Sequence, residues 1–252
     1  MKLPLLSLLA CLATLTLCSC IEGEEEIRVH ADGSGRATYR LEAPNLLFKR
    51  IGNLDDILER ARDYSTNSDN LTIHSLNAQT RGARTTVEVD LSFGNLRKVD
   101  GFLSSFRDPE DPATKSEIEI IIGEIDMDIS FPTYSYYREI DLSPLLTDGA
   151  LPIGGKAMLG DSAINYTMHL PAAPTHHDAD SVSPDGRTLR WSFPVAEMAS
   201  GPVSMSFEAP LPLPWRKIFL LVISVLLLLC LLPFIRKKKL KTSRPHVRPN
   251  HP

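Results

Sequence analysis

Residues 25–41, EEIRVHADGSGRATYRL, hold two alternating stretches on either side of a tight-turn sequence. Apolar side chains alternate with polar ones around Asp32-Gly33-Ser34-Gly35, at Ile27, Val29, Ala37, Tyr39 and Leu41. A period of two places every second side chain on one face of a strand. Asp and Gly are residues that tight turns favour. The stretch therefore predicts a β-hairpin with one apolar face.

A helix follows this hairpin, and the same order then occurs again. After Pro44, apolar residues recur every three or four positions at Leu47, Ile51, Leu54, Leu58 and Ala61, and Gly52-Asn53 divides the pattern, with Asn53 capping the second part. A second hairpin is predicted from Leu71–Thr80 and Thr85–Phe93, and a second helical stripe from Leu96, Val99, Leu103 and Phe106. Hairpin–helix units predict an α+β fold, an antiparallel sheet with helices packed on one face.

The second half of the domain is expected to be rich in strands from about residue 117. Alternating or apolar stretches lie at Ile118–Ile122, Ile125–Phe131, Tyr134–Leu142, Ile164–Leu170, Thr188–Phe193 and Val203–Phe207. Because the helical patterns all lie earlier, this half is predicted to be mainly β-structure.

Two clusters carry residue types that could support chemistry. Glu124, Asp126 and Asp128 share one face of a predicted strand, and His176-His177-Asp178 lies close to Asp180. A solvent-exposed face of an acidic protein and a loop explain them more simply than acid–base or metal sites. We expect no cofactor, no metal and no catalytic residues, and an envelope hydrolase without a recognisable motif stays as the enzymatic alternative.

Near the C-terminus, residues 218–235 read IFLLVISVLLLLCLLPFI and carry no charge. Eighteen helical residues reach roughly 27 Å, close to the thickness of the hydrocarbon core. Trp215 occupies the position of an interfacial aromatic residue, and Arg236, Lys237, Lys238 and Lys239 follow the stretch. The positive-inside rule then predicts one membrane span with a cytoplasmic C-terminal tail.

The N-terminus has the features of a secretory leader. Lys2 precedes an apolar run that ends in Leu17-Cys18-Ser19-Cys20, which resembles a bacterial lipobox. The resemblance implies cleavage before Cys20 and a lipid on its sulfur. No cysteine lies between residues 21 and 217, so the domain is expected to fold without disulfides.

These features predict six segments. They are a lipoprotein signal peptide (1–19), an acidic spacer (20–26), an extracytoplasmic domain (27–208), a Pro-rich stalk (209–217), a span (218–235) and a basic cytoplasmic tail (236–252). The protein is thus expected in the cell (inner) membrane. Because both anchors would enter the same leaflet, the first and last strands are expected to begin and end on the membrane-facing side.

The charge of the predicted ectodomain is strongly negative. Between the leader and Leu213 the chain carries all 31 acidic residues and 17 basic ones, a net charge of −14. Such a domain would be repelled by nucleic acid and by anionic headgroups. We therefore expect no nucleic-acid partner, and favour a protein or lipid partner that is basic or neutral.

The plan as a whole resembles the LppM-like bacterial lipoproteins. The features are Cys20, the acidic lead Glu24–Glu26, the turn Asp32–Gly35, the strand end Leu170-Pro171, the turn Asp185-Gly186 before Trp191, and one C-terminal span with a basic tail. The resemblance implies an α+β, lipid-associated domain outside the plasma membrane and no catalytic residues. A non-catalytic binding or interaction module is the favoured function, with a lipid-binding or lipid-presenting domain as the alternative.

Overall fold

The computed structural model describes residues 21–107, 114–147, 159, 162–211, 220 and 223–225. The strands are β1 (Glu22–Val29), β2 (Gly35–Pro44), β3 (Leu71–Arg81), β4 (Arg84–Phe93), β5 (Glu124–Ser130), β6 (Thr133–Ile140), β7 (Ala163–His169), β8 (His176–His177), β9 (Ser181–Val182), β10 (Thr188–Pro194) and β11 (Val203–Pro210). The helices are α2 (Asn45–Ile51), α3 (Leu54–Asn67), the 3-10 turn η1 (Leu96–Lys98), α4 (Asp100–Ser104), α5 (Glu117–Ile122), α6 (Ser143–Thr147) and α8 (Val195–Met198).

The strands form two sheets, so the α+β class is confirmed but the single antiparallel sheet is not. The seven-stranded sheet has the order β3-β4-β2-β1-β7-β10-β9, and the four-stranded sheet has the order β5-β6-β11-β8. In the larger sheet β1 and β7 are parallel. The sequence patterns are local, whereas this pairing joins strands more than 130 residues apart, which explains why it was not predicted.

The two predicted hairpins are confirmed, and they lie side by side in the larger sheet. β2 pairs with β1 through the first hairpin and with β4 of the second. Gly35 has to be glycine, because a Cβ there would collide with the carbonyl oxygen of Arg28 and the ring of Phe93. The close approach of these groups fixes the register of β1 against β2.

The first helical pattern divides as its sequence indicates. α2 ends before Gly52, whose φ of 109° is one that L-residues rarely adopt, and α3 begins after Asn53. The side chain of Asn53 accepts a hydrogen bond from the backbone N–H of Asp55, which satisfies one of the free N–H groups of the first turn. The Gly-Asn pair therefore lets two helices turn across the sheet.

Residues 117–122 form a helix, so the prediction that strands begin there was wrong. Ser116 and Glu119 form a capping box, in which each side chain bonds the backbone N–H of the other. Ser-x-x-Glu before an apolar run is a known helix-start signal, and it outweighs the β propensity of the isoleucines. Gly123, with φ of 85°, then ends α5.

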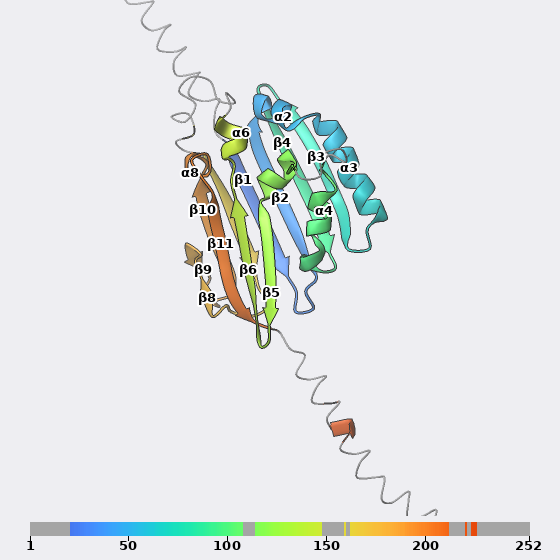
Figure 1. Cartoon of the computed structure of the whole chain (residues 1–252), viewed down its shortest axis with the longest axis vertical. Coiled ribbons are helices and arrows are strands. Elements are labelled where there is room, and N and C mark those ends of the chain that lie inside the picture. Colours follow the sequence, from blue (N-terminus) through green and yellow to red (C-terminus); the bar gives the residue numbers. More distant parts are fainter. Residues whose placement is uncertain are drawn as a thin grey trace, which may run out of the picture. The chain divides into compact units, whose positions relative to one another are not determined.

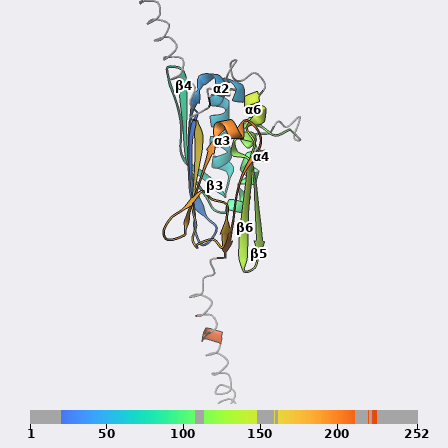
Figure 2. The ribbon, with the colours of Figure 1, turned by 90° about the vertical axis from the view of Figure 1, so that its left-hand side faces the viewer.

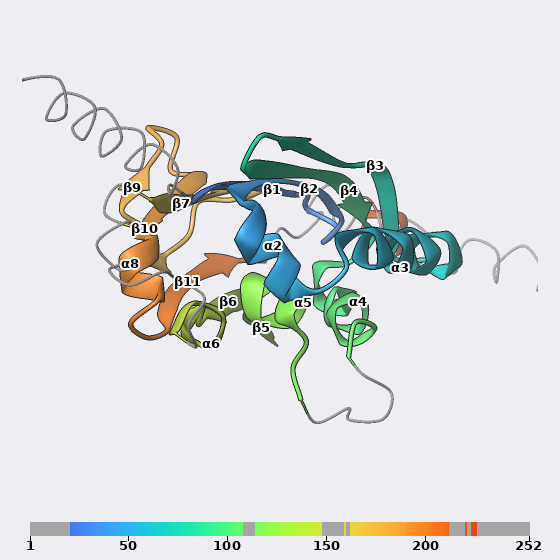
Figure 3. The ribbon, with the colours of Figure 1, turned by 90° about the horizontal axis from the view of Figure 1, so that it is seen from above.

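The helices and the smaller sheet share one side of the larger sheet. Figure 3, the view from above, draws the larger sheet edge-on with the second layer on its lower side. That layer consists of α2, α3, α4 and α5 next to β1–β4, and of β6 and β11 next to β1, β7 and β10. The edge-on view shows the same two layers (Figure 2). The apolar core lies between these layers and includes Trp191, Met205 and Ile140, each at most 2% exposed.

The described chain enters and leaves this domain at opposite ends. Ile21 lines a small void together with residues of α6, which follows the Ile140 end of β6. At the other end of β6, Pro210 pairs with Thr133. Figure 1 shows α2 and α6 at one end and the β5–β6 turn and the end of β11 at the other. The eight residues of β6 separate these ends by about 25 Å.

The first strand thus begins and the last strand ends at opposite ends of the domain, and the expectation that both face a membrane stays a prediction. β1 begins at Glu22, within the residues assigned to the spacer, and β11 runs through Pro210, within those assigned to the stalk. The spacer was assigned from its acidity, but every second residue of it belongs to the inward row of a strand. In the part of the chain that the structure describes, no helix has both the length and the apolarity that crossing a membrane requires.

A candidate ligand cavity between the larger sheet and the helices

A cavity of about 200 Å³ lies between β1–β4 of the larger sheet and the layer beneath them. The sheet contributes Glu25, Ile27, Ala37, Tyr39, Leu41, Leu71, Ile73, Leu76, Val87, Val89, Leu91 and Phe93. The opposite wall contains Phe48, Ile51, Leu54, Ile57, Leu58, Ala61, Leu96, Val99, Phe102, Leu103, Phe106, Ile118, Ile121, Ile122, Ile125 and Arg138. Apart from Glu25, Tyr39 and Arg138, all of these side chains are apolar.

The alternation of the hairpins turns this wall inward. Ala37, Tyr39 and Leu41 come from β2, and the neighbouring Val89 and Leu91 come from β4. On β3 the register shifts between Ile73 and Ser75, which marks a β-bulge. The extra residue keeps Leu76 on the same face as Ile73, since the pairing after it resumes one step later.

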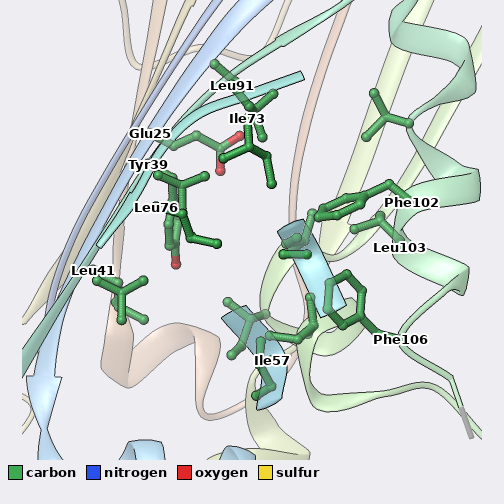
Figure 4. Close-up of a pocket in the computed structure, with 18 of the residues that line it drawn as sticks. Glu25, Tyr39, Leu41, Ile57, Ile73, Leu76, Leu91, Phe102, Leu103 and Phe106 are labelled. Carbon is green, nitrogen blue, oxygen red and sulfur yellow. The ribbon is translucent and has the colours of Figure 1, made fainter. Parts of the chain in front are cut away.

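Many of these inward-facing side chains are only half-buried. Ile57, Leu76 and Leu91 keep part of their surface accessible, although they point into the domain. Figure 4 shows Leu41, Leu76, Ile73 and Leu91 on one side of an open space and Phe102, Leu103 and Phe106 across it. A side chain of a close-packed core has neighbours on all sides, and these lack neighbours on the cavity side.

A buried ion pair closes one side of the cavity. The guanidinium of Arg138, on β6, donates from Nη1 and Nη2 to the two carboxylate oxygens of Glu25, on β1, at 2.6 and 3.0 Å. The Nε–H donates to the carbonyl of Ile122 at 2.6 Å, and the Tyr166 ring lies 5.2 Å from the guanidinium carbon. The bidentate geometry joins the two layers directly.

The electrostatics of this pair keep both groups engaged with each other. Burial opposes the charge on Arg138, but the Glu25 carboxylate outweighs it and raises the pKa of the guanidinium. Burial also raises the pKa of the nearby Tyr39 hydroxyl, which therefore stays neutral. Because the charges satisfy each other, the walls offer a ligand no free charge from this pair.

Aromatic rings close the far side of the cavity. Tyr64, Phe102 and Phe106 pack edge to face, with centroids 5.2 and 5.1 Å apart. With Ala61, Leu71 and Leu103 they belong to an apolar cluster distinct from the main core. The helical stripe predicted from Leu96, Val99, Leu103 and Phe106 thus has its apolar face on the cavity.

A salt bridge holds α5 against this aromatic cluster. Arg107 donates from Nε to both carboxylate oxygens of Glu119, at 2.8 and 3.0 Å. Burial alone would raise the pKa of Glu119, but the Arg107 guanidinium and the Ser116 N–H hold it below its usual range. The charged form of Glu119 therefore stabilises the cover of the cavity.

A much smaller void of about 20 Å³ adjoins the cavity under α2 and α6. Tyr39, Leu41 and Ile51 line both spaces. Ile21 belongs to the wall of the smaller one, and its backbone N–H donates to the Ser162 hydroxyl at 2.8 Å. The first residue that the structure describes is thus fixed beside the cavity.

The carboxylates of β5 lie apart from the cavity. Glu124, Asp126 and Asp128 are exposed on the outer face of the strand, as expected for a solvated face. Glu124 pairs with Lys115 at 2.8 Å, and the Ser130 hydroxyl donates to Asp128. The described walls of the cavity include none of the three.

The histidine cluster is part of the second sheet. His176 and His177 form β8 and pair with Glu208 and Phe207 of β11, and both are exposed. Asp178 accepts hydrogen bonds from the Trp191 indole at 2.7 Å and from Ser206, which ties three segments together. Among the described residues, no group of three or more His, Cys, Asp or Glu could hold a metal ion.

The remaining predicted site residues lie outside the described residues. These are the lipid-attachment residue Cys20 and the topology residues Trp215, Arg236, Lys237, Lys238 and Lys239. Of the predicted span, only residues 220 and 223–225 are described.

The sequence analysis missed the two polar residues of the cavity, although a signal for each was present. Glu25 is in phase with Ile27 and Val29 on β1, and Arg138 is in phase with Tyr136 and Ile140 on β6. A charge that shares the inward row of a strand is a candidate for a buried pair.

Together the layers and the cavity define a two-sheet α+β domain with an internal apolar cavity. No protein-family model and no curated protein matches the chain. A similar solved structure is the NMR structure of the folded domain of the Mycobacterium tuberculosis protein LppM. The TM-score is 0.46 and the identity 13%, over 78% of this chain and 93% of the other.

Proposed function

We propose that the chain is a membrane-anchored, non-catalytic envelope protein whose domain binds the apolar chain of a lipid in the cavity. The observation that carries this proposal is the space of about 200 Å³ between β1–β4 and the helices, with almost wholly apolar walls. The two anchors and the location outside the inner membrane rest on the sequence, through Cys20 and residues 218–235.

The size of the cavity favours an occupant over a packing defect. A fully enclosed core cavity costs about 24 cal/mol per Å³, so roughly 5 kcal/mol is the upper bound for the packing lost in this partly open space. This is comparable to the whole stability of many domains, about 5–15 kcal/mol. An apolar chain between Leu76, Leu91 and Phe102 would recover part of that energy.

The chemistry of the walls indicates what kind of group enters. An apolar cavity of about 150 Å³ can bind benzene, so this one accommodates a somewhat larger apolar group, such as the end of an acyl chain. Glu25 and Arg138 already satisfy each other, which disfavours a charged group. The Tyr39 hydroxyl is a neutral polar group in the wall, and it could contact one polar atom of the ligand.

A hydrolase is supported less well. Catalytic carboxylates and histidines have to converge on a cleft. The three carboxylates of β5 are exposed to solvent. The Asp178 carboxylate already accepts hydrogen bonds from the Trp191 indole and the Ser206 hydroxyl. Among the described residues that line the cavity there is no histidine, cysteine, serine or threonine.

The test is binding of a fluorescent fatty acid to the full chain in mild detergent, with mass spectrometry of lipid extracted from the purified protein. Ala37→Leu places a larger side chain in the cavity and is expected to weaken binding at least tenfold. Ala31→Leu, the same substitution in the exposed β1–β2 turn, is the matched control and should bind normally. Equal binding by both variants would contradict the proposal.

The experiment also separates a diffusible lipid from the chain's own predicted anchor. Because Ile21 lines the adjoining void, a lipid on Cys20 would begin close to the cavity. In the Cys20→Ser variant, extracted lipid that persists is diffusible. Loss of the occupant, together with faster binding of the probe, would identify the covalent lipid of the chain itself.

A further inference from the structure

The β5–β6 turn carries apolar side chains that the domain leaves uncovered. Phe131 is 75% exposed at the turn, and Ile129 is 44% exposed at the end of β5. Large apolar residues at the tip of a hairpin contribute little to the core, so their exposure favours a partner outside the domain.

The chain leaves the domain beside the same turn. Pro210 pairs with Thr133, and the backbone N–H of Leu211 donates to the carbonyl of Pro132 at 2.9 Å. Seven residues further on, the sequence enters the uncharged stretch 218–235. Seven residues span at most about 25 Å when fully extended. A membrane entered at Ile218 thus has its surface within reach of Phe131.

We propose that the β5–β6 turn inserts Phe131 into the interfacial region of the bilayer in which the chain is anchored. Segments that lie in the membrane interface commonly bury Trp, Phe and Leu side chains at its acyl boundary. The contact can be weak by itself, because the anchor keeps the turn at a high local concentration near the surface. This proposal does not depend on the ligand of the cavity.

The charges around the turn indicate the kind of lipid surface. Asp126 and Asp128 lie on the outer face of β5 just before the turn, and Glu208 lies on β11 nearby. Residues 129–135 include no lysine or arginine. Carboxylates disfavour anionic headgroups, so a zwitterionic surface fits this tip best.

Insertion of the turn would also determine the orientation of the domain relative to the bilayer. The α6 end, with Ile21, lies about 25 Å from the turn along β6. A domain that stands on its turn holds Ile21 away from the surface, whereas a lipid on Cys20 inserted in the same bilayer would pull that end down and lay the domain on its side. The exposed Leu46 of α2 marks the α6 end and serves as the reference position.

The test uses the full chain reconstituted into phosphatidylcholine vesicles. Phe131→Trp and Leu46→Trp are made separately in a Cys20→Ser/Trp215→Phe background, which removes the predicted N-terminal lipid and leaves Trp191 buried and common to both. Lipids brominated along the acyl chain quench indoles that enter the bilayer. We expect at least twofold stronger quenching in Phe131→Trp than in Leu46→Trp, with Ile129→Trp as a second reporter of the tip.

Two outcomes would overturn the proposal. Quenching of Phe131→Trp no greater than that of Leu46→Trp would show that the turn stays out of the bilayer. A blue-shifted emission without quenching would assign the turn to a protein contact, such as a second copy of the chain. Both variants change exposed side chains, so circular dichroism should show an unchanged fold.

Discussion

The space between the two layers has a packed half and an open half, and both are apolar. In the packed half Leu189, Val195 and Met198 are fully buried. In the open half Ile57, Leu76 and Leu91 surround a cavity of about 200 Å³. Residue type is similar in both halves, so apolar composition alone does not determine whether a core is filled. What differs is whether the opposing layer brings side chains close enough to meet.

The Glu25–Arg138 pair lies at the boundary between the halves. On one side it lines the cavity, and on the other Arg138 lies over the Tyr166 ring of the main core. A pair that joins β1 to β6 holds the layers at a fixed separation, which we infer keeps the cavity open.

Breaking this pair should produce the largest effect. Arg138→Met leaves the Glu25 carboxylate buried without its partner, and we expect a loss of about 3–5 kcal/mol in the free energy of unfolding. The double variant Arg138→Met/Glu25→Leu removes both charges and should recover most of that loss. Urea unfolding followed by Trp191 fluorescence measures both. A loss of less than about 1 kcal/mol in the single variant, the size expected for an exposed ion pair, would contradict the inference that this pair holds the two layers apart.

The same truncation made in each half should sharpen the comparison. Leu189→Ala creates a new cavity in the packed half and should cost about 4 kcal/mol, near the upper part of the range for such changes. Leu91→Ala enlarges an existing cavity, where fewer contacts are lost, and should cost about 2 kcal/mol less. Equal costs in one urea series would indicate that the halves are packed alike.

A smaller, pH-dependent effect is expected at the cover of the open half. The pKa of Glu119 is lowered in the folded state, so its stabilisation is present above its unfolded pKa and is lost as pH falls through the lowered value. Glu119→Gln weakens the pair with Arg107, so it should lower the free energy of unfolding by about 1 kcal/mol at neutral pH. The free energy of unfolding of this variant should also fall less steeply as the pH is lowered, which is the acid limb of its pH profile. Glu117→Gln, at an exposed position of the same helix, is the control. An acid limb unchanged by Glu119→Gln would contradict this role.

How far the sequence predicts the molecule depends on how local each feature is. The hairpins and the break at Gly52-Asn53 were predicted, because alternation and capping act within a few residues. The parallel pairing of β1 with β7 and the contact of Glu25 with Arg138 join residues more than 100 positions apart, and one sequence carries no local signal for them. The helix at Glu117–Ile122 was missed although its capping box is visible in the sequence.

The cavity itself was not predicted, and its walls explain why. The pattern places Ala37, Tyr39 and Leu41 on the inward face correctly, but a pattern of faces says nothing of the distance between layers. That distance depends on the helices across the space and on the pair at its boundary. The sequence could thus predict a binding module in general terms, whereas the cavity could be located only in the structure.

The most direct test of the open half uses two alanines on one strand. Ala37 and Ala43 lie on the same face of β2, but Ala37 lines the cavity, whereas Ala43 is fully buried. Urea unfolding of Ala37→Leu and Ala43→Leu compares filling a space with overpacking a core. The account predicts that Ala37→Leu keeps or gains stability, up to about 1 kcal/mol, while Ala43→Leu loses about 1–3 kcal/mol. A comparable loss in Ala37→Leu would contradict the presence of an open cavity.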